Sequence, residues 1–119
     1  MRHEKAEVKM TLEELRSQID ELDRQLVALL SQRAKAAQMI GHLKAATSLP
    51  VYEPNREKVI YANVREANQG PLPDIELTHI FERIIDVMRA LQRNELASDR
   101  KALAEHQSES HHSESGSQQ

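Results

Sequence analysis

The chain has 119 residues, a formal net charge of −3 and no cysteine. These values exclude a disulfide framework and a zinc site built from thiolates, and they argue against nucleic-acid binding through a generally basic surface. The sequence contains one phenylalanine, two tyrosines, three glycines and four prolines. A β-sandwich or barrel needs many turn residues and β-branched or aromatic strands, so this composition predicts an all-α protein with an aliphatic core.

Residues 1–10 are polar and charged, and they lack the apolar segment of a secretory signal. The longest uninterrupted apolar run covers residues 26–30, far short of the roughly 20 residues that span a bilayer. The absence of cysteine agrees with a reducing compartment. We therefore expect a polar leader at residues 1–10, no membrane attachment and a cytoplasmic location.

A long first helix is predicted from about Thr11 to about Ala46. Thr11 and Glu14 form the T-x-x-E pattern of a capping box, which marks a helix start. No proline occurs between residues 11 and 49, and apolar or small side chains recur at intervals of three and four. These side chains are Leu12, Leu15, Ile19, Leu22, Leu26, Leu29, Ala36, Ile40 and Leu43. A helix of this length extends about 54 Å.

Two shorter helices are predicted to follow. Pro54 suits the first turn of a second helix, which should end at about Asn68, before a Gln-Gly-Pro sequence. Asp74 is the expected N-cap of a third helix, whose apolar pattern fades between Leu96 and Leu103. The predicted fold class is all-α, with a long, a short and a medium helix in each chain.

These helices define one expected helical domain at residues 11–96. Residues 97–119 hold the end of the third helix and a tail of Ser, His, Glu and Gln, which composition predicts to be disordered. The tail histidines suggest adventitious metal binding at most, and His42 and His79 stand apart in the sequence. The sequence has no glycine-rich phosphate loop and no nucleophile motif. We expect no metal site and no cofactor.

The unequal helix lengths favour a dimer. A helix of about 54 Å with an apolar stripe along its length cannot bury that stripe against two shorter helices of its own chain. The remainder would be an exposed apolar patch of the kind that monomers avoid. Two long helices that pair lengthwise would bury it. A parallel coiled coil is the simpler alternative, because a three-four stripe is its signature.

Two cations share the striped face of the first helix. Arg33 occupies a stripe position, and Lys44 lies eleven residues later, about 20° from three full turns. Ala37 and Ile40 fall on the same face, and the small Ala37 leaves space between the cations. An unpaired guanidinium is costly to bury, so Arg33 must meet water, a carboxylate or an anionic ligand. A local ion pair or a snorkelling side chain is the simpler interpretation.

Other polar residues extend the pattern. Arg16 either pairs with an acidic residue of its own helix or, in an antiparallel dimer, approaches the partner's cationic face. Arg56 and Glu57 open the second helix. Gln92 lies four residues after Met88 on the apolar face of the third helix, where a buried amide must find hydrogen-bond partners. Contact with a ligand and bonding within the core explain Gln92 equally well.

The ordered set of these features resembles the all-helical AroQ class of chorismate mutases. The matching segments are LRSQIDELDRQLVALLSQRAKAAQMIGHLK at residues 15–44, PVYEPNREKV at residues 50–59 and IFERIIDVMRALQ at residues 80–92. Within them, L-R, I-x-x-L-D, L-L-x-x-R, G-x-x-K, P-V, R-E, I-F-x-x-I-I and Q follow one another in the family's order. The similarity covers about residues 11–95.

The resemblance implies an intertwined helical homodimer that converts chorismate to prephenate in phenylalanine and tyrosine biosynthesis. It implies no cofactor and no metal. Lys44, Gln92 and Arg33 would be the catalytic residues. The substrate site would comprise Arg16 from the neighbouring subunit together with Arg33, Lys44, Glu53, Arg56, Glu57, Met88 and Gln92.

The implied roles differ from residue to residue. The two arginines of the first helix would hold the substrate carboxylates, and Lys44 and Gln92 would reach the ether oxygen. Glu57 would meet the ring hydroxyl, aided by the backbone around Glu53, and Arg56 would support the cationic wall. Two positions depart from the common pattern: Met88 stands where some members have a serine, and Glu53 stands for the more usual aspartate.

The implied rearrangement is pericyclic, so it needs no nucleophile, proton transfer or metal. Holding the dicarboxylate in its compact conformer and stabilising negative charge on the ether oxygen would suffice. An isochorismate pyruvate-lyase on the same fold and a non-catalytic regulatory dimer module are the alternatives. Glu57 favours the mutase over the lyase, and the retained cations disfavour the regulatory module. A neighbouring enzyme of the shikimate pathway is a further candidate partner.

Overall fold

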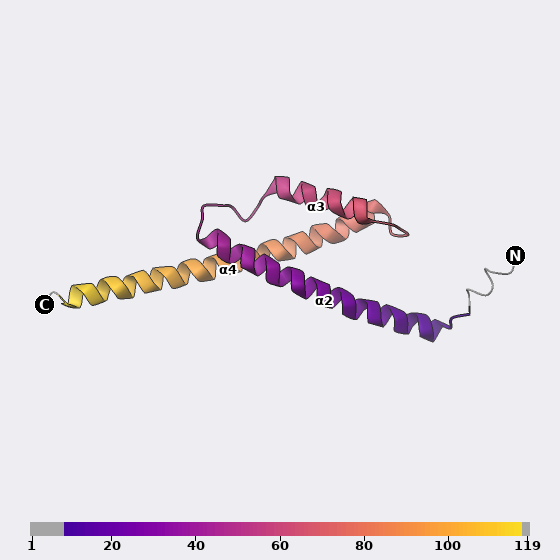
Figure 1. Ribbon diagram of the computed structural model, residues 1–119, viewed down its shortest axis with the longest axis horizontal. Helices are drawn as coiled ribbons and strands as arrows, with labels where there is room; N and C mark the ends of the chain where they lie inside the picture. Colours follow the sequence, from indigo (N-terminus) through magenta and orange to yellow (C-terminus); the bar gives the residue numbers. More distant parts are fainter. Residues whose placement is uncertain (1–8, 118–119) are drawn as a thin grey trace. The chain divides into compact units, whose positions relative to one another are not determined.

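A computed structural model describes the backbone of residues 9–117 and the side chains of residues 9–108 (Figure 1). This part of the chain contains α2 (Leu12–Ala45), α3 (Pro54–Ala67) and α4 (Asp74–Ser117), with no strand. The predicted all-α class is therefore confirmed. Apart from its last two residues, the predicted polar leader lies outside the described residues. Among the described residues, no helix combines the length and apolar character that crossing a membrane requires.

The start of α2 forms as the sequence predicts. The chain divides into two compact units, residues 1–33 and residues 34–119, and this helix start belongs to the first unit. The Thr11 hydroxyl oxygen accepts a hydrogen bond from the Glu14 amide at 3.1 Å, which is one of the two bonds of a capping box. The Thr11 carbonyl accepts from the Leu15 amide at 3.0 Å. Two glutamates in the first turn also favour the positive end of the helix dipole.

The apolar stripe of the first unit is uncovered. Every residue from 9 to 32 is exposed. The exposed fractions are 43% for Leu15, 55% for Ile19, 50% for Leu22, 56% for Leu26 and 60% for Leu29. The described part of this unit does not cover the stripe, because it consists of a short lead-in and a single helix.

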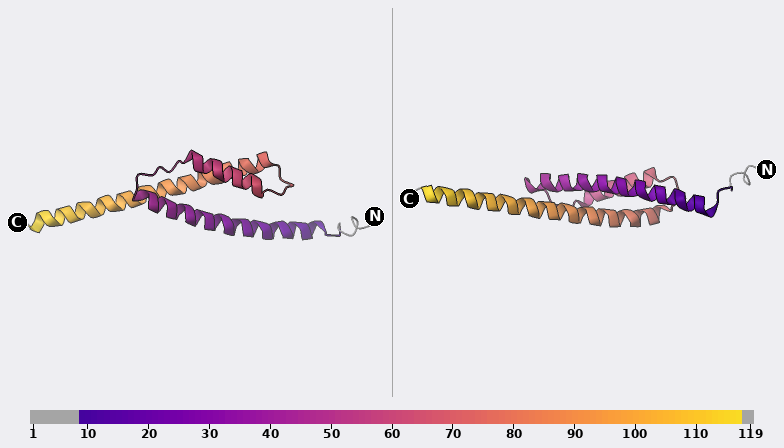
Figure 2. Two further views of the ribbon diagram at one scale, coloured as in Figure 1. Left: turned by 45° about the horizontal axis from the view of Figure 1, so that its top comes forward. Right: turned by 90° about the horizontal axis from the view of Figure 1, so that it is seen from below.

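The second unit contains the end of α2 together with α3 and α4. Figures 1 and 2 show α3 lying alongside the first part of α4, and the two helices are in contact. Among the described residues of this unit, the buried apolar side chains are Ala37, Ile85 and Met88. The end of α2 meets α4 at Gly41, where an added Cβ would lie 2.9 Å from the Gln92 carbonyl oxygen. A side chain at this position would therefore collide with the α4 backbone.

The turn between α3 and α4 is closed by Asn68. Its side-chain amide donates to the Leu72 carbonyl at 2.8 Å and to an Asp74 carboxylate oxygen at 2.7 Å. Its side-chain oxygen accepts from the Gly70 amide at 3.0 Å, and Gly70 has a φ of 72°, which favours glycine. The predicted helix stop is confirmed, but Asp74 is the first residue of α4 and not its N-cap. Its carboxylate is engaged by Asn68.

The third helix is longer than the sequence pattern predicts. α4 continues to Ser117, past residues 96–103, where the apolar pattern of the sequence fades. No glycine or proline occurs from residue 74 to residue 115, and Ala, Glu, Gln, Lys and Arg, which favour helix, are frequent near residue 100. Helix propensity near residue 100 therefore favours helix in the stretch where the apolar pattern fades. The side chains of His111 and His112 lie outside the described set.

Candidate active site

Lys44 is a buried cation at the junction of α2 and α4. The residue is 4% exposed, and its ammonium group donates to three acceptors. These are the side-chain oxygens of Gln92 and Glu53, each at 3.0 Å, and the Val51 carbonyl at 3.3 Å. An ammonium has three hydrogens, so its donors are matched. The Glu53 carboxylate offsets the cost of removing the charge from water.

The ammonium of Lys44 also fixes the orientation of the Gln92 amide. An ammonium group has no acceptor, so it must face the amide oxygen and not the amide nitrogen. The amide NH₂ is thereby directed away from Lys44 as a donor. Gln92 is half-buried on the α4 face that carries Met88, as the sequence predicts. Lys44 and the Gln92 NH₂ together form a pair of donors supplied by two helices.

The striped face of α2 is arranged differently from the expectation. Ala37, Gly41 and Lys44 are the buried residues of this helix, whereas Ile40 is 42% exposed. The buried face therefore runs through Gly41 and not through Ile40. Ala37 is 4% exposed and forms part of the core.

A second polar cluster joins α3 to α4. An oxygen of the Glu57 carboxylate accepts from the Arg89 guanidinium at 2.6 Å, and these side chains are 17% and 20% exposed. The hydrogen bond to Glu57 raises the pKa of Arg89, so the guanidinium stays charged. The same guanidinium lies 5.0 Å from the centre of the Tyr52 ring, a cation–π distance.

The sequence interpretation missed Arg89. Its partner Glu57 is 32 positions away and on another helix, so helical spacing cannot reveal the pair. A usable signal was nonetheless present: Arg89 lies three residues before Gln92, on the same side of the helix. Glu57 is thus held by a partner before any ligand binds.

Replacing Arg89 with methionine is expected to lower the free energy of unfolding by about 1–3 kcal/mol, because Glu57 would keep a mostly buried carboxylate without its charged hydrogen-bond donor. Urea unfolding would measure the loss. Arg93→Met on the exposed face of α4 is the matched control and should change little. Adding Glu57→Gln to Arg89→Met should restore part of the loss; strictly additive effects would show that the pair is not coupled.

The remaining predicted residues occupy varied surroundings. Arg56 is exposed on α3, and Met88 is buried beside Ile85, 6% exposed. In the first unit, Arg33 is half-buried, and Arg16 is exposed and forms an ion pair with Glu13 at 3.5 Å. The local pairing considered for Arg16 is therefore present. The roles of these four residues toward a substrate stay predictions.

The comparisons with known proteins agree with the all-helical fold. Residues 15–93 match the model of the family described as chorismate mutase type II. The match covers more than half of the chain, so the chain belongs to the chorismate mutase type II family.

Sequence relatives include proteins of two sizes. The chain is 36% identical over 86 residues to a bifunctional chorismate mutase/prephenate dehydratase of Aquifex aeolicus, covering 69% of this chain and 24% of that protein. It is 31% identical over 86 residues to a chorismate mutase of Methanocaldococcus jannaschii, covering 71% of this chain and 87% of that protein. The chain thus spans about a quarter of the length of the bifunctional relatives and most of the length of the shorter one.

Two solved structures share this fold. A chorismate mutase of Thermus thermophilus (Form II) has a TM-score of 0.67 and 33% identity, covering 69% of this chain and 93% of that chain. A chorismate mutase of Helicobacter pylori in complex with prephenate has a TM-score of 0.66 and 32% identity, covering 72% and 93%. Both similarities lie well above the level at which only a fold is shared.

Proposed function

We propose that the chain is a chorismate mutase that rearranges chorismate to prephenate. The observation that carries the proposal is the buried Lys44 ammonium bonded to the Gln92 oxygen, which leaves the Gln92 NH₂ free to donate. Family membership supports it, as does the Helicobacter pylori relative with bound prephenate. Direct support would come from loss of chorismate absorbance with the purified protein. No turnover of chorismate would refute the proposal, and turnover of isochorismate in its place would assign the lyase.

Binding and electrostatics account for the proposed reaction. The side chains hold the flexible dicarboxylate in the compact conformer that brings the two bonding carbons together. As the C–O bond breaks, negative charge grows on the ether oxygen, and Lys44 and Gln92 donate hydrogen bonds to it. A donor aimed at developing charge stabilises the transition state more than the ground state. No proton is transferred in the reaction, so neither residue has to change its protonation state.

The other residues have supporting roles in the proposal. Arg33 and the partner subunit's Arg16 bind the substrate carboxylates, Arg56 adds positive charge, and Met88 shapes the apolar wall. Glu57, held by Arg89, accepts from the ring hydroxyl, and the backbone around Glu53 assists it. The cysteine-free sequence suits a reducing compartment, and we assign the reaction to the cytoplasm.

The proposal includes a homodimer in which each site takes one residue from the second chain. The uncovered stripe of residues 9–32 supports it, because an exposed apolar helix face of this size requires a cover. A mixing experiment tests the exchange of Arg16. Inactive Arg16→Ala and Lys44→Ala proteins are unfolded, mixed in equal amounts and refolded together. If Arg16 crosses between subunits, half of the dimers are mixed and each has one intact site, so about a quarter of wild-type activity should return.

Other outcomes of the mixing experiment are equally informative. If Arg16 serves the site of its own chain, no mixed dimer contains an intact site and activity stays at the level of the separate variants. Sedimentation of the wild-type protein as a single chain at micromolar concentration would contradict the dimer. Sedimentation thus tests whether the protein is a dimer, and the mixing experiment tests whether Arg16 contributes to the site of its own chain or of the partner chain.

Replacing Gln92 with glutamate should make activity depend on acid. At neutral pH the introduced carboxylate has no hydrogen to donate and repels the growing negative charge on the ether oxygen, so the rate should fall steeply. The rate should rise as the solution becomes more acidic, since the protonated group can donate again. A kcat profile between pH 4 and 8 would measure this. The kcat of the wild type should not rise at acid pH. If kcat rose equally in both proteins, Gln92 would not donate a hydrogen bond in the reaction.

A further inference from the structure

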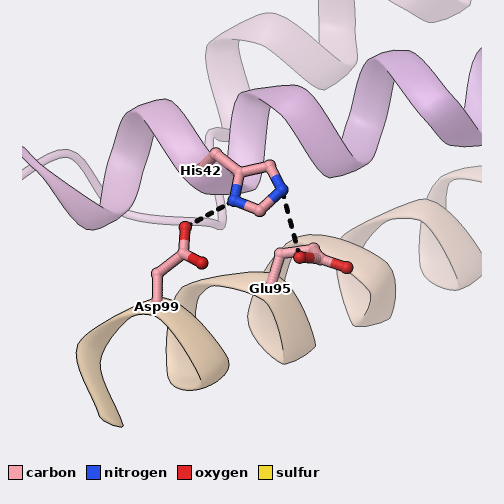
Figure 3. A group of neighbouring side chains, drawn as sticks. All are labelled: His42, Glu95 and Asp99. Carbon is pink, nitrogen blue, oxygen red and sulfur yellow. Dashed lines mark hydrogen bonds and ion pairs between the residues drawn. The ribbon is translucent and has the colours of Figure 1, made fainter. Parts of the chain in front are cut away.

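One histidine and two carboxylates gather on the outer side of the α2–α4 junction (Figure 3). His42 comes from α2, and Glu95 and Asp99 come from α4. The Nδ1 atom of His42 lies 2.5 Å from an Asp99 oxygen, and its Nε2 atom lies 3.2 Å from a Glu95 oxygen. One potential ligand atom from each residue lies within 4.8 Å of the other two. The proposed reaction uses none of these groups.

We propose that His42, Glu95 and Asp99 bind one divalent transition-metal ion, for which Zn²⁺ serves as the probe. Neutral imidazole and carboxylate are both common zinc ligands, and sites with three protein ligands leave the fourth position to water. Two carboxylates and a neutral imidazole carry two negative charges, which matches a divalent cation. The imidazole nitrogen favours zinc over calcium or magnesium, which prefer oxygen ligands.

The surroundings of the three side chains suit a metal ion. Glu95 and Asp99 are four residues apart, so they project from the same face of α4. The Gln38 amide donates to the second oxygen of Glu95 at 3.3 Å, a contact that orients the carboxylate as supporting hydrogen bonds orient metal ligands. A pocket lined by Ala45, Ala46, Ala102 and Leu103 adjoins His42 and Asp99 and gives room for bound water.

Without a metal, the protonated His42 imidazole pairs with the Asp99 and Glu95 carboxylates. The hydrogen bond to Asp99 raises the pKa of His42, and the charges of Asp99 and Glu95 act in the same direction, so the imidazolium persists above its usual range. A metal ion must displace that proton because it binds the neutral nitrogen. The ion would join α2 to α4 one helical turn from the Lys44–Gln92 pair.

The test measures Zn²⁺ binding by calorimetry in a full-length background with His3, His106, His111 and His112 replaced by alanine. That background removes the leader and tail histidines that could bind zinc adventitiously. We expect one Zn²⁺ per chain, released protons that change the apparent enthalpy between buffers, and a higher melting temperature with the metal. His42→Ala and Asp99→Asn should each weaken binding at least tenfold. His79→Ala is the matched control on α4 and should bind as the background does.

The choice of variants separates metal binding from folding. Asp99→Asn keeps the side-chain shape and an oxygen that can accept from the imidazole, so helical circular dichroism should be unchanged while zinc affinity falls. Equal zinc affinity in the background and in His42→Ala would overturn the proposal. If the wild-type protein binds Zn²⁺ and the background protein does not, the leader and tail histidines alone bind the metal, and the proposal is wrong. None of these measurements depends on turnover of chorismate, so the zinc proposal can fail or succeed independently of the proposed function.

Discussion

The Lys44→Ala variant is expected to turn over chorismate about 10²–10³-fold more slowly than the wild type, the loss typical of removing one donor to a developing oxyanion. The variant removes the cation proposed to face the ether oxygen, and it also frees the Gln92 amide from the group that orients it. Steady-state kinetics should place most of the loss in kcat, because the donor matters most when charge has developed.

The fold should survive this substitution. Glu53 would lose its ion pair, but its side chain is 41% exposed, so water can solvate the carboxylate. Circular dichroism should show unchanged helical content. Lys35→Ala, a surface lysine of the same helix, is the matched control and should retain full activity. Near-normal turnover by the Lys44→Ala variant would eliminate the proposed mechanism.

Gly41→Ala should be nearly as harmful as loss of the lysine itself. The added Cβ would lie 2.9 Å from the Gln92 carbonyl oxygen and 3.1 Å from the Gln92 Cα, and backbone atoms cannot move aside as a flexible side chain can. Alanine gains about 1 kcal/mol of helix propensity over glycine, whereas overpacking costs about 1–3 kcal/mol. The helices must therefore separate. A shift of about 1 Å between Lys44 and Gln92 should cost about 10²-fold in kcat.

A second glycine distinguishes this effect from general strain. Gly70 also has a required role, but through its φ of 72° in an open turn with nothing near its missing Cβ. Gly70→Ala should lower stability by about 1–2 kcal/mol and leave kcat unchanged. Urea unfolding and chorismate kinetics on both variants would compare them. If Gly41→Ala kept normal kcat, the close helix approach would not position the site.

Local rules predicted the helix boundaries well. The Thr11 cap, the Pro54 start and the Asn68 stop depend on neighbours within a few residues, and each is present in the structure. The three- and four-residue periodicity placed Gln92 on the inner face of α4. The same periodicity selected Ile40 where Gly41 is buried, because the pattern counts apolar side chains and a close backbone contact needs none.

Partners across helices could not be predicted from spacing. The pairing of Lys44 with Glu53, of Arg89 with Glu57 and of His42 with Asp99 depends on how separate segments pack. His42 has no second histidine one turn away, so spacing along α2 does not predict a metal site there. Its two acidic neighbours come from another helix, 53 and 57 positions later. α4 is also longer than the apolar periodicity predicts, because periodicity marks only the part of a helix that packs against a core.

The full set of acceptors around the Lys44 ammonium has a consequence for ligand binding. An incoming ether oxygen can only replace an acceptor that is already in place, so the exchange brings little net gain before the reaction begins. The gain appears later, when the breaking bond makes that oxygen a better acceptor than the Val51 carbonyl that it displaced. Because the Lys44 ammonium already has its acceptors in the resting protein, its hydrogen bond to the ether oxygen stabilises the transition state more than the bound substrate.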